Sequence, residues 1–405
     1  MINIAVMGYG TIGSGVVEVI NTNGSSIAGR VGEPLNVKYV LDLRDFPGDP
    51  IQEKIVHDVQ VILDDPEVAI VVETMGGTNP AYTFVKKALL AGKSVATSNK
   101  ELVAAHGAEL LALAKSKELN FLFEASVGGG IPIIRPLNQS LTADEIYEIT
   151  GILNGTTNFI LTKMEREGLS FDLVLKEAQE LGYAERNPEA DVEGYDACRK
   201  IAILSSLAYG MQVDYEDIYT EGITKISDVD FKYAKKLGMV VKLFATSKRI
   251  DDKFYAMVCP VMIDSGHPLY AVNDVYNGIL VKGNVIGNVM FYGAGAGKLP
   301  TASAVVADVV DAAKHMNRNI MTNWSENKLE LADIGTSSKS FFVRIAGSKA
   351  AKAAMVEDAF GPVKYIELDE MDEFAVITGV MTENAFEEAA AKVKGIRGRI
   401  RVEAN

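Results

Sequence analysis

The stretch "GYAERNPEADVEGYDACRK", which runs from Gly182 to Lys200, carries the residues best suited to acid–base chemistry. Asp196 and Lys200 are four positions apart, so on a helix they lie on one face. The following residues, 201–209, are apolar almost all round, and this pattern predicts a largely buried helix over 192–209. A buried charge is costly unless it is paired or used. The two residues therefore form either a structural ion pair or a proton-transferring group.

The same stretch contains four further carboxylates, Glu185, Glu189, Asp191 and Glu193. Asp191 suits the N-cap of the predicted helix and Glu193 its first turn, because the amino end of a helix attracts negative charge. We accept a helix-entry role for Glu189 and Glu193. From the residues alone it stays open whether Glu185 and Asp191 face a substrate.

A second lysine, Lys100, follows a predicted strand at 93–98 and precedes a predicted helix at 101–117. That position is the carboxyl edge of a parallel sheet, where folds of this kind bind ligands. The alternative is that Ser98 or Asn99 caps the helix and that Lys100 is solvated in its first turn. Considered alone, Lys100 fits the capping interpretation better.

A glycine fingerprint, "GYGTIG", follows the predicted strand 2–7 and opens a helical pattern. The first glycine permits a tight turn, the second lets the backbone approach a pyrophosphate, and the third allows close packing of helix and strand. The amino end of the helix supplies amides and partial positive charge for the phosphates. The alternative is a tight turn without a ligand, but the position at the start of an alternating series favours a dinucleotide. The predicted contacts are Gly8, Gly10, Thr11, Ile12 and Gly13.

The end of the second predicted strand bears on the choice between NAD and NADP. Asp42 suits a ribose 2′-hydroxyl and Arg44 a 2′-phosphate. Asp42 lies 42 − 13 = 29 positions after the last glycine, later than the usual spacing of about 20. Both can also be ordinary polar residues at a strand end, so the sequence leaves the cofactor as NADP or NAD.

The elements that must position these residues alternate strand and helix, which predicts an α/β fold with a doubly wound, Rossmann-type parallel sheet over about 1–130, completed by 298–316. A second domain of α+β type, 131–316, has helices near 156–167 and 171–181 and then long β-runs. A linker is expected at 317–338, and 339–405 has the order βαββαβ of a ferredoxin-like domain. The predicted strands of the first domain are 2–7, 36–42, 68–74, 93–98 and 120–126, with helices near 80–91 and 101–117.

Composition excludes several classes of function. The net charge of −14 argues against nucleic acid as a partner, since the protein would repel the phosphates. No apolar run reaches the roughly 20 residues that span a bilayer, and the first residues lack the pattern of a signal peptide. The two cysteines stand in unlike surroundings and the four histidines are scattered, so neither a disulfide framework nor a transition-metal site is expected. These features predict a cytoplasmic protein without a membrane partner.

Several long motifs together resemble the homoserine dehydrogenase family, whose members interconvert L-homoserine and L-aspartate 4-semialdehyde with a nicotinamide cofactor, in the biosynthesis of threonine, methionine and isoleucine. They occur in order over the first 316 residues. The motifs are "GYGTIG" (8–13), "TSNKELVA" (97–104), "FEASVGGGIPII" (123–134), "GILNGTTNFILTKM" (151–164), "ELGYAERNPEADVEGYDACRKIAIL" (180–204) and "YGAGAGKLPTASAVVADV" (292–309).

The resemblance implies direct hydride transfer without a catalytic metal, and it implies a role for each charged residue. Lys200 matches the general acid/base, and Lys100 the lysine that contacts cofactor and substrate. Glu185 matches the residue that binds the substrate ammonium group, with Asp191 and Asp196 completing the pocket. Relatives often carry two adjacent aspartates where this chain has Ala190 and Asp191, so the role of the first cannot be transferred.

The resemblance also implies contacts beyond these charged residues. The loop at Asn154, Gly155 and Thr156 matches one near the substrate, and Thr97, Ser98 and Gly297 match contacts of the cofactor. "EASVGGGIP" resembles a loop that holds a sodium ion through Glu124 and the carbonyls of Val127, Gly129 and Ile131. Oxygen ligands suit such a cation. A glycine-rich hinge is the alternative interpretation of that loop.

The C-terminal βαββαβ pattern resembles an ACT domain, which implies an amino-acid effector, threonine first. Its first loop, "IAGSKAAKAA", lacks the usual Asp and Pro-Gly, so a domain that only dimerises is the alternative. A homodimer or homotetramer is expected, with the dimer made by the long β-runs. Of the rival functions, aspartate-semialdehyde dehydrogenase needs a cysteine nucleophile with a histidine, which Cys198 and Cys259 lack. A non-catalytic sensor remains the rival from another class; the presence of both lysines favours the enzyme.

Overall fold

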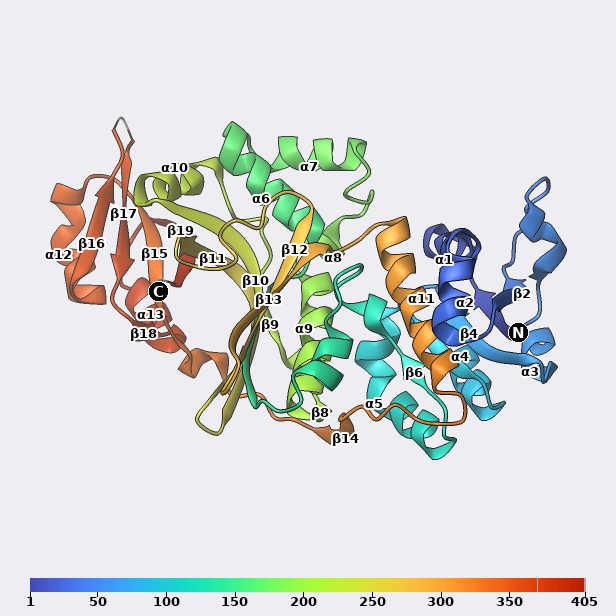
Figure 1. Ribbon diagram of the computed structural model, residues 1–405. Coiled ribbons are helices and arrows are strands. Elements are labelled where there is room, and N and C mark those ends of the chain that lie inside the picture. Colours follow the sequence, from blue (N-terminus) through green and yellow to red (C-terminus); the bar gives the residue numbers. More distant parts are fainter. Residues whose placement is uncertain (370, 404–405) are drawn as a thin grey trace. The chain divides into compact units, whose positions relative to one another are not determined.

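The structure is a computed structural model that describes residues 1–369 and 371–403 (Figure 1). Its contacts divide the chain into two compact units. The first consists of Met1–Ile146, Ala202–Tyr215 and Phe291–Leu329; the second consists of Tyr147–Ile201, Glu216–Met290 and the residues from Glu330 onward. The division into domains predicted from the sequence had three parts and different boundaries, and those boundaries stay a prediction.

The first unit contains a parallel sheet of six strands in the order β3-β2-β1-β4-β5-β6. This order reverses direction at β1, as in a doubly wound sheet, so the predicted α/β fold class is confirmed. Apolar, β-branched residues fill the central strands because both faces are covered by helices. The strands are β1 (Ile2–Met7), β2 (Leu35–Leu41), β3 (Ile55–Val56), β4 (Val68–Glu73), β5 (Ser94–Thr97) and β6 (Phe121–Leu122).

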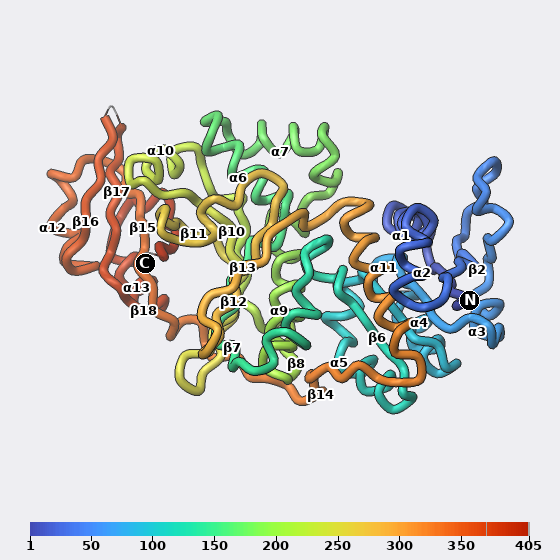
Figure 2. The backbone as a smooth tube through the Cα atoms, in the orientation of Figure 1, coloured from blue at the N-terminus to red at the C-terminus, as the bar shows by residue number. Residues whose placement is uncertain are grey.

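The helices of the first unit include one that arrives late in the chain. Figure 2 shows that α11, drawn in orange, lies beside the blue α1, and the two pack together. Gly15 permits this approach, since a Cβ there would lie 3.0 Å from the Cβ of Ala302. The helices are α1 (Thr11–Thr22), α2 (Gly24–Val31), α3 (Val59–Asp64), α4 (Ala81–Leu90), α5 (Lys100–Ser116) and α11 (Lys298–Lys314).

Two stretches of the first unit differ from the sequence-based expectation. The expected strand 120–126 ends at Leu122, and Glu124–Ser126 forms a 3₁₀ turn because the Glu124 carboxylate binds backbone amides of 133–135. Within the expected linker, β14 (Ser325–Lys328) pairs with β8 (Met211–Gln212). Trp324, only 5% exposed, donates its indole N–H to Gln212, so this part of the chain is packed rather than free.

The second unit is built on a long sheet whose strand order is β13-β12-β7-β10-β11-β19-β15-β17-β16. The predicted long β-runs are confirmed as an antiparallel pair, β10 and β11, whose register extends from Met239↔Asp264 to Ile250↔Lys253. The strands before the C-terminal part are β7 (Ile146–Ile152), β9 (Tyr219–Thr220), β10 (Met239–Ile250), β11 (Lys253–Asp264), β12 (Tyr276–Gly283) and β13 (Gly287–Ala294).

The C-terminal part of the chain continues this sheet. Its elements follow the predicted order βαββαβ, and β19 pairs in parallel with β11 at Val261↔Arg401. The separate ferredoxin-like part expected from the sequence thus shares a sheet with the preceding residues. Its elements are β15 (Ser338–Ala346), α12 (Lys349–Phe360), β16 (Val363–Glu367), β17 (Glu373–Thr378), β18 (Met381–Thr382), α13 (Glu383–Ala390) and β19 (Ile396–Glu403).

The helices of the second unit are α6 (Gly155–Glu167), α7 (Phe171–Glu180), α8 (Glu189–Val192), α9 (Tyr195–Tyr209) and α10 (Asp228–Leu237). The helix predicted over 192–209 is confirmed from Tyr195 to Tyr209, but its predicted start and the N-cap role of Asp191 were wrong. Gly194, at φ +84°, breaks the chain direction, so Asp191 belongs to the short α8 and α9 starts afresh at Tyr195. Among the described residues, no helix combines the length and the apolar character that a bilayer crossing requires.

Candidate active site

The glycine loop between β1 and α1 has the geometry that each glycine predicts. Gly8 has φ +95°, which side chains rarely adopt. A Cβ on Gly13 would lie 1.8 Å from the carbonyl oxygen of Gly8, whereas a Cβ on Gly10 would meet nothing within 4 Å. Gly13 is therefore needed for the loop itself, and Gly10 leaves open space above it.

A pocket of about 500 Å³ adjoins this loop at the carboxyl ends of β1, β2 and β4. Its volume is within the range of roughly 300–1,000 Å³ typical of small-molecule sites. It contains two of the fingerprint glycines and both residues proposed for the ribose. The lining residues are Gly8, Gly10, Leu41, Asp42, Leu43, Arg44, His57, Val59, Thr74, Met75, Pro80 and Phe84.

Asp42 and Arg44 are bound to each other beside this pocket. The Arg44 guanidinium donates to both Asp42 oxygens at 2.9 Å, and one of them also accepts the Tyr9 amide at 2.8 Å. The hydrogen bond from Arg44 holds the pKa of Asp42 well below its usual value. The Arg44 side chain is 62% exposed and lies over the Phe46 ring. The aspartate is thus occupied, while the guanidinium keeps a face toward solvent.

A buried acid that the sequence analysis missed orders the neighbouring loop. Glu73, at the end of β4, is fully buried, and burial raises its pKa. It accepts the Thr97 hydroxyl at 2.6 Å and the Met75 amide at 2.7 Å. The Thr97 hydroxyl therefore bonds inside the protein. The signal in the sequence was a glutamate that closes an otherwise apolar strand.

The start of α5 matches the capping interpretation of its sequence. The Asn99 side chain accepts the Leu102 amide at 3.1 Å and donates to the Gly77 carbonyl at 2.6 Å. Lys100 is the first residue of α5 and is partly buried. It belongs to the first unit, as do Ser98 and the glycine loop.

In the second unit the charged pair from the sequence forms as expected. The Nζ atom of Lys200 lies 2.8 Å from an Asp196 oxygen and donates to the carbonyl of Leu153 at 2.8 Å. The side chains of Lys200 and Asp196 are 11% and 8% exposed. Because α9 carries both residues one turn apart, the helix itself fixes their distance.

Asn154 joins this pair to a second carboxylate. Its side-chain amide donates to Asp191 at 2.8 Å and to Asp196 at 2.9 Å, while its oxygen caps α6 by accepting the Thr157 amide. Asn154, Asp191, Asp196 and Lys200, which the sequence placed in one site, thus form one cluster. We call these four residues the polar cluster.

The remaining predicted substrate residues differ in their surroundings. Gly155 packs tightly, since a Cβ there would lie 2.7 Å from the carbonyl of Val275. Thr156 donates its hydroxyl to the Tyr183 carbonyl at 2.6 Å. Glu185 is exposed, and among the described residues its carboxylate has no contact with the polar cluster.

The proposed cation loop uses its glutamate differently from the expectation. The Glu124 carboxylate accepts the backbone amides of Ile134 at 2.9 Å and Arg135 at 2.8 Å, and that of Ile133 as well. The side chain is therefore directed at amides. Gly129, at φ +56°, packs against the Gly295 carbonyl and Gly297 caps α11. Within the described residues no group of three or more His, Cys, Asp or Glu side chains suits a metal ion.

A buried lysine anchors α6, the helix that follows Asn154. Lys242 on β10 is fully buried and donates to the carbonyl of Val272 at 2.7 Å and to the side chain of Asn273 at 2.8 Å. It also reaches Asn158 of α6. Burial lowers the pKa of Lys242 to about 8.

We expect Lys242→Met to remove a pH dependence of stability in the alkaline range. The ordinary pKa of 10.5 applies in the unfolded chain, and the folded value is about 8. The unfolded state therefore binds more protons between these values, and the free energy of unfolding rises with pH there. Denaturant unfolding of both proteins at several pH values checks this. The difference, parent minus variant, should increase with pH; a flat difference would contradict the assignment.

The first unit contains a Rossmann-type sheet with a glycine-loop pocket, and the second contains the polar cluster of lysine, carboxylates and amide. These features define a nicotinamide-dependent oxidoreductase. Two family models match the chain: "Homoserine dehydrogenase" over residues 132–310 and "Homoserine dehydrogenase, NAD binding domain" over residues 8–124. The chain belongs to the homoserine dehydrogenase family, and it is an NAD(P)-dependent enzyme. The resemblance seen in its motifs is confirmed.

Individual relatives agree with the family models. A homoserine dehydrogenase of Bacillus subtilis is 44% identical over 329 residues, which cover 80% of this chain and 75% of that protein. One of Corynebacterium glutamicum is 38% identical, covering 99% and 96%. Among solved structures, a homoserine dehydrogenase from Thiobacillus denitrificans has a TM-score of 0.91 at 35% identity, covering 100% and 98%. A hyperthermophilic archaeal homoserine dehydrogenase in complex with NADPH has a TM-score of 0.65 at 30% identity, covering 77% and 97%.

Proposed function

We propose that Lys200 is the general acid/base of this homoserine dehydrogenase, which interconverts L-homoserine and L-aspartate 4-semialdehyde. The observation that carries this role is the position of Lys200, whose Nζ atom is fixed by Asp196 and the Leu153 carbonyl in a mostly buried setting. Both of these partners accept hydrogen bonds, so the site keeps a proton donor in place. The nicotinamide cofactor supplies or accepts the hydride.

In the reducing direction Lys200 would give its proton to the aldehyde oxygen. In the oxidising direction it takes the hydroxyl proton. Asp196 and the Leu153 carbonyl orient the ammonium group of Lys200. Positioned groups of this kind contribute roughly 10²–10⁴-fold to a rate. Lys100, at the head of α5, is proposed to contact the cofactor and to stabilise developing negative charge on the oxygen.

The substrate ammonium group is proposed to bind the carboxylates of the polar cluster. Asn154 holds Asp191 and Asp196 close together, which concentrates negative charge where a cation is bound. Glu185, exposed on the segment before α8, is proposed to reach the same ammonium group. Gly155 and Thr156 shape the adjoining backbone of α6.

We further propose NADP as the preferred cofactor. Asp42 has both oxygens occupied, which leaves it poorly available to a ribose hydroxyl, and Arg44 presents cationic donors that suit a 2′-phosphate. The proposed cofactor contacts are Gly8, Gly10, Thr11, Ile12, Gly13, Asp42, Arg44, Thr97, Ser98, Lys100 and Gly297; the buried Thr97 hydroxyl acts through Glu73.

Arg44→Ala should raise the KM for NADP by about 10-fold or more, because only NADP carries the extra phosphate. The KM for NAD should not rise, since the variant frees Asp42 for a ribose hydroxyl. Initial rates with both cofactors test this. Arg30→Ala is a matched control, since Arg30 is an exposed arginine of α2 that does not line the pocket. Equal losses with both cofactors would show that Arg44 acts on the fold of the loop instead.

A sodium site is proposed at the loop 124–131, with the carbonyls of Val127, Gly129 and Ile131 as ligands. Carbonyl oxygens suit a hard monovalent cation. The Glu124 carboxylate is bound to amides, so this residue could offer only its own carbonyl. The ion would have a structural part in the loop that packs near Gly295.

For the assembly we propose a homodimer or homotetramer. β10 and β11 each have strand neighbours on both sides, and the sheet ends at β13 and at β16; we propose the edge at β13 for the partner. That strand exposes Met290 and Tyr292, 37% and 54% accessible. The C-terminal βαββαβ part is proposed to take an amino-acid effector, threonine first.

The experiment that tests these proposals is oxidation of L-homoserine by the purified protein. NAD⁺ and NADP⁺ are compared in sodium and potassium buffers, with and without threonine, and sedimentation gives the assembly. Appearance of reduced nicotinamide supports the reaction, and the separate arms test cofactor, cation and effector. If neither cofactor is reduced and the semialdehyde is not consumed in reverse, the catalytic role fails and a sensor function comes next.

A further inference from the structure

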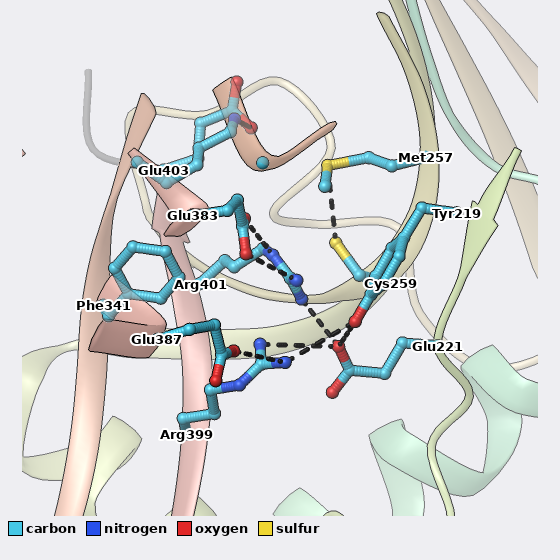
Figure 3. A network of polar contacts seen from close by, with 12 residues as sticks. Tyr219, Glu221, Met257, Cys259, Phe341, Glu383, Glu387, Arg399, Arg401 and Glu403 are labelled. Atoms are coloured by element: carbon cyan, nitrogen blue, oxygen red, sulfur yellow. Dashed lines mark hydrogen bonds and ion pairs between the residues drawn. The ribbon is translucent and has the colours of Figure 1, made fainter. Parts of the chain in front are cut away.

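A buried arginine joins the C-terminal part of the second unit to the residues before it (Figure 3). Arg401 on β19 is 2% exposed and forms two hydrogen bonds with Glu383 of α13, at 2.6 and 2.9 Å. Its third nitrogen donates to Glu221 at 2.7 Å. A charge this deeply buried requires partners. One partner, Glu383, is close to Arg401 in sequence, whereas the other, Glu221, lies 180 positions before it.

Glu221 is held by more than this one contact. It accepts the Tyr219 hydroxyl at 3.0 Å and lies 3.5 Å from Arg399, while the Arg401 guanidinium packs over the Tyr219 ring. Burial opposes its ionisation, but the two guanidinium groups outweigh burial and hold the pKa of Glu221 below its usual value. Figure 3 shows these side chains converging between β19 and β9.

Glu221 belongs to a short segment, residues 219–223, which we call the strap. The strap runs along β11 through the pairs Met257↔Tyr219 and Val258↔Thr220 and through the Glu221 amide, which donates to Val258 at 2.8 Å. Its position is therefore set on one side by the sheet and on the other by Arg401.

The far end of the strap touches the residues that carry Asp191. The Ile223 amide donates to the Val192 carbonyl at 2.8 Å. Gly222 allows this approach, because a Cβ there would lie 2.2 Å from the same carbonyl oxygen and 2.4 Å from the Cα of Glu193. Val192 follows Asp191 in α8, so the strap supports the short helix from which Asp191 reaches Asn154.

We infer that Glu221 and Arg401 are positioning residues for substrate binding: through the strap they hold α8, and with it Asp191, in the geometry of the polar cluster. The inference rests on the proposed role of Asp191 and deepens it, since it makes the C-terminal part a support of the substrate site. α8 has only four residues, and a helix this short is not stable by itself. The hydrogen bond from the strap to Val192 therefore helps to hold α8 in place.

The test compares KM for L-homoserine in Glu221→Ala and in Gly222→Ala. Glu221→Ala removes the hydrogen bond between the strap and Arg401. Gly222→Ala adds a methyl group that pushes the strap away from the Val192 carbonyl of α8. Each should raise this KM by about 10-fold, with kcat and the KM for the cofactor changed by less than about 3-fold. Glu221→Gln keeps an acceptor for Arg401, so it should restore most of the affinity. Arg401 retains its two bonds to Glu383 in these variants, which protects the fold.

Glu373→Ala is the matched control. Glu373 is a buried glutamate that binds two arginines, Arg344 and Arg397, in the same C-terminal part, and it does not touch the strap. Thermal unfolding should show lowered stability for both Glu→Ala variants, but only Glu221→Ala should change the KM for homoserine. Equal changes in both, or no change in Glu221→Ala, would overturn the inference.

Asp191→Asn separates this inference from the function on which it rests. If Asp191→Asn leaves the KM for homoserine unchanged, the proposed role of Asp191 fails, whatever the strap does. If Asp191→Asn raises that KM while Glu221→Ala and Gly222→Ala do not, the substrate role stands and the strap is only structural.

Discussion

Lys200→Met reduces the turnover of L-homoserine by roughly 10²–10⁴-fold, the contribution expected of a positioned general acid/base. Methionine fills a similar volume beside Asp196 and Leu153 but carries no proton. The cofactor pocket lies in the first unit and Lys200 in the second, so the Kd for NADPH should change by less than about 2-fold. Steady-state rates and fluorescence titration of NADPH measure the two quantities.

Lys176→Ala is the control for this result. Lys176 forms an i,i+4 pair with Glu180, as Lys200 does with Asp196, but its side chain is 76% exposed. Its loss should leave turnover unchanged. Since Lys200→Met leaves Asp196 without its lysine, the double variant Asp196→Asn with Lys200→Met provides a neutral version of the site. Parallel loss of cofactor binding and turnover in both forms would contradict the role of Lys200.

The second large effect is expected from two glycines of one loop that differ in what surrounds them. Gly10→Ala should leave the unfolding temperature of the free protein unchanged, because the added methyl group meets nothing within 4 Å. It should weaken NADPH binding by about 10-fold or more, since the methyl group stands where the pyrophosphate approaches. Calorimetric titration and thermal unfolding check both statements.

Gly13→Ala should lower both stability and NADPH affinity. Its methyl group would lie 1.8 Å from the Gly8 carbonyl oxygen and 2.9 Å from the Thr74 hydroxyl oxygen, so the loop and the start of α1 must shift. The contrast between the two variants is the test. If Gly10→Ala destabilises the free protein as much as Gly13→Ala does, Gly10 serves the fold and the assignment of the phosphate position is wrong.

Local patterns made both the glycine loop and the Asp196–Lys200 pair predictable from the sequence. The i,i+4 spacing of Asp196 and Lys200 fixed their contact in advance, because a helix brings such residues together wherever it lies. The glycine fingerprint likewise specifies its own backbone. Element order and fold class followed from the periodicity of apolar residues, because that periodicity shows which side of each strand or helix is buried.

The parts that could not be predicted depend on residues far apart in the chain. The break at Gly194 changed the surroundings of Asp191; the local signal was the glycine itself, a residue typical of helix ends, which the prediction of a continuous helix passed over. Glu124 was expected to be a cation ligand from the family resemblance of its loop; the engagement of its carboxylate by amides of 133–135 is a matter of loop geometry. The Arg401–Glu221 pair joins positions that no periodicity relates.

The parallel pairing of β19 with β11 sets an order of events during synthesis. Until β19 emerges from the ribosome, residues 261–263 of β11 lack their partner strand, and an open edge of that kind invites pairing with other chains. The strap meanwhile lacks Arg401. By the inferred role of the strap, α8 gains its full support only once Arg401 has been made, and until then the nascent chain is an intermediate that chaperones would need to shield.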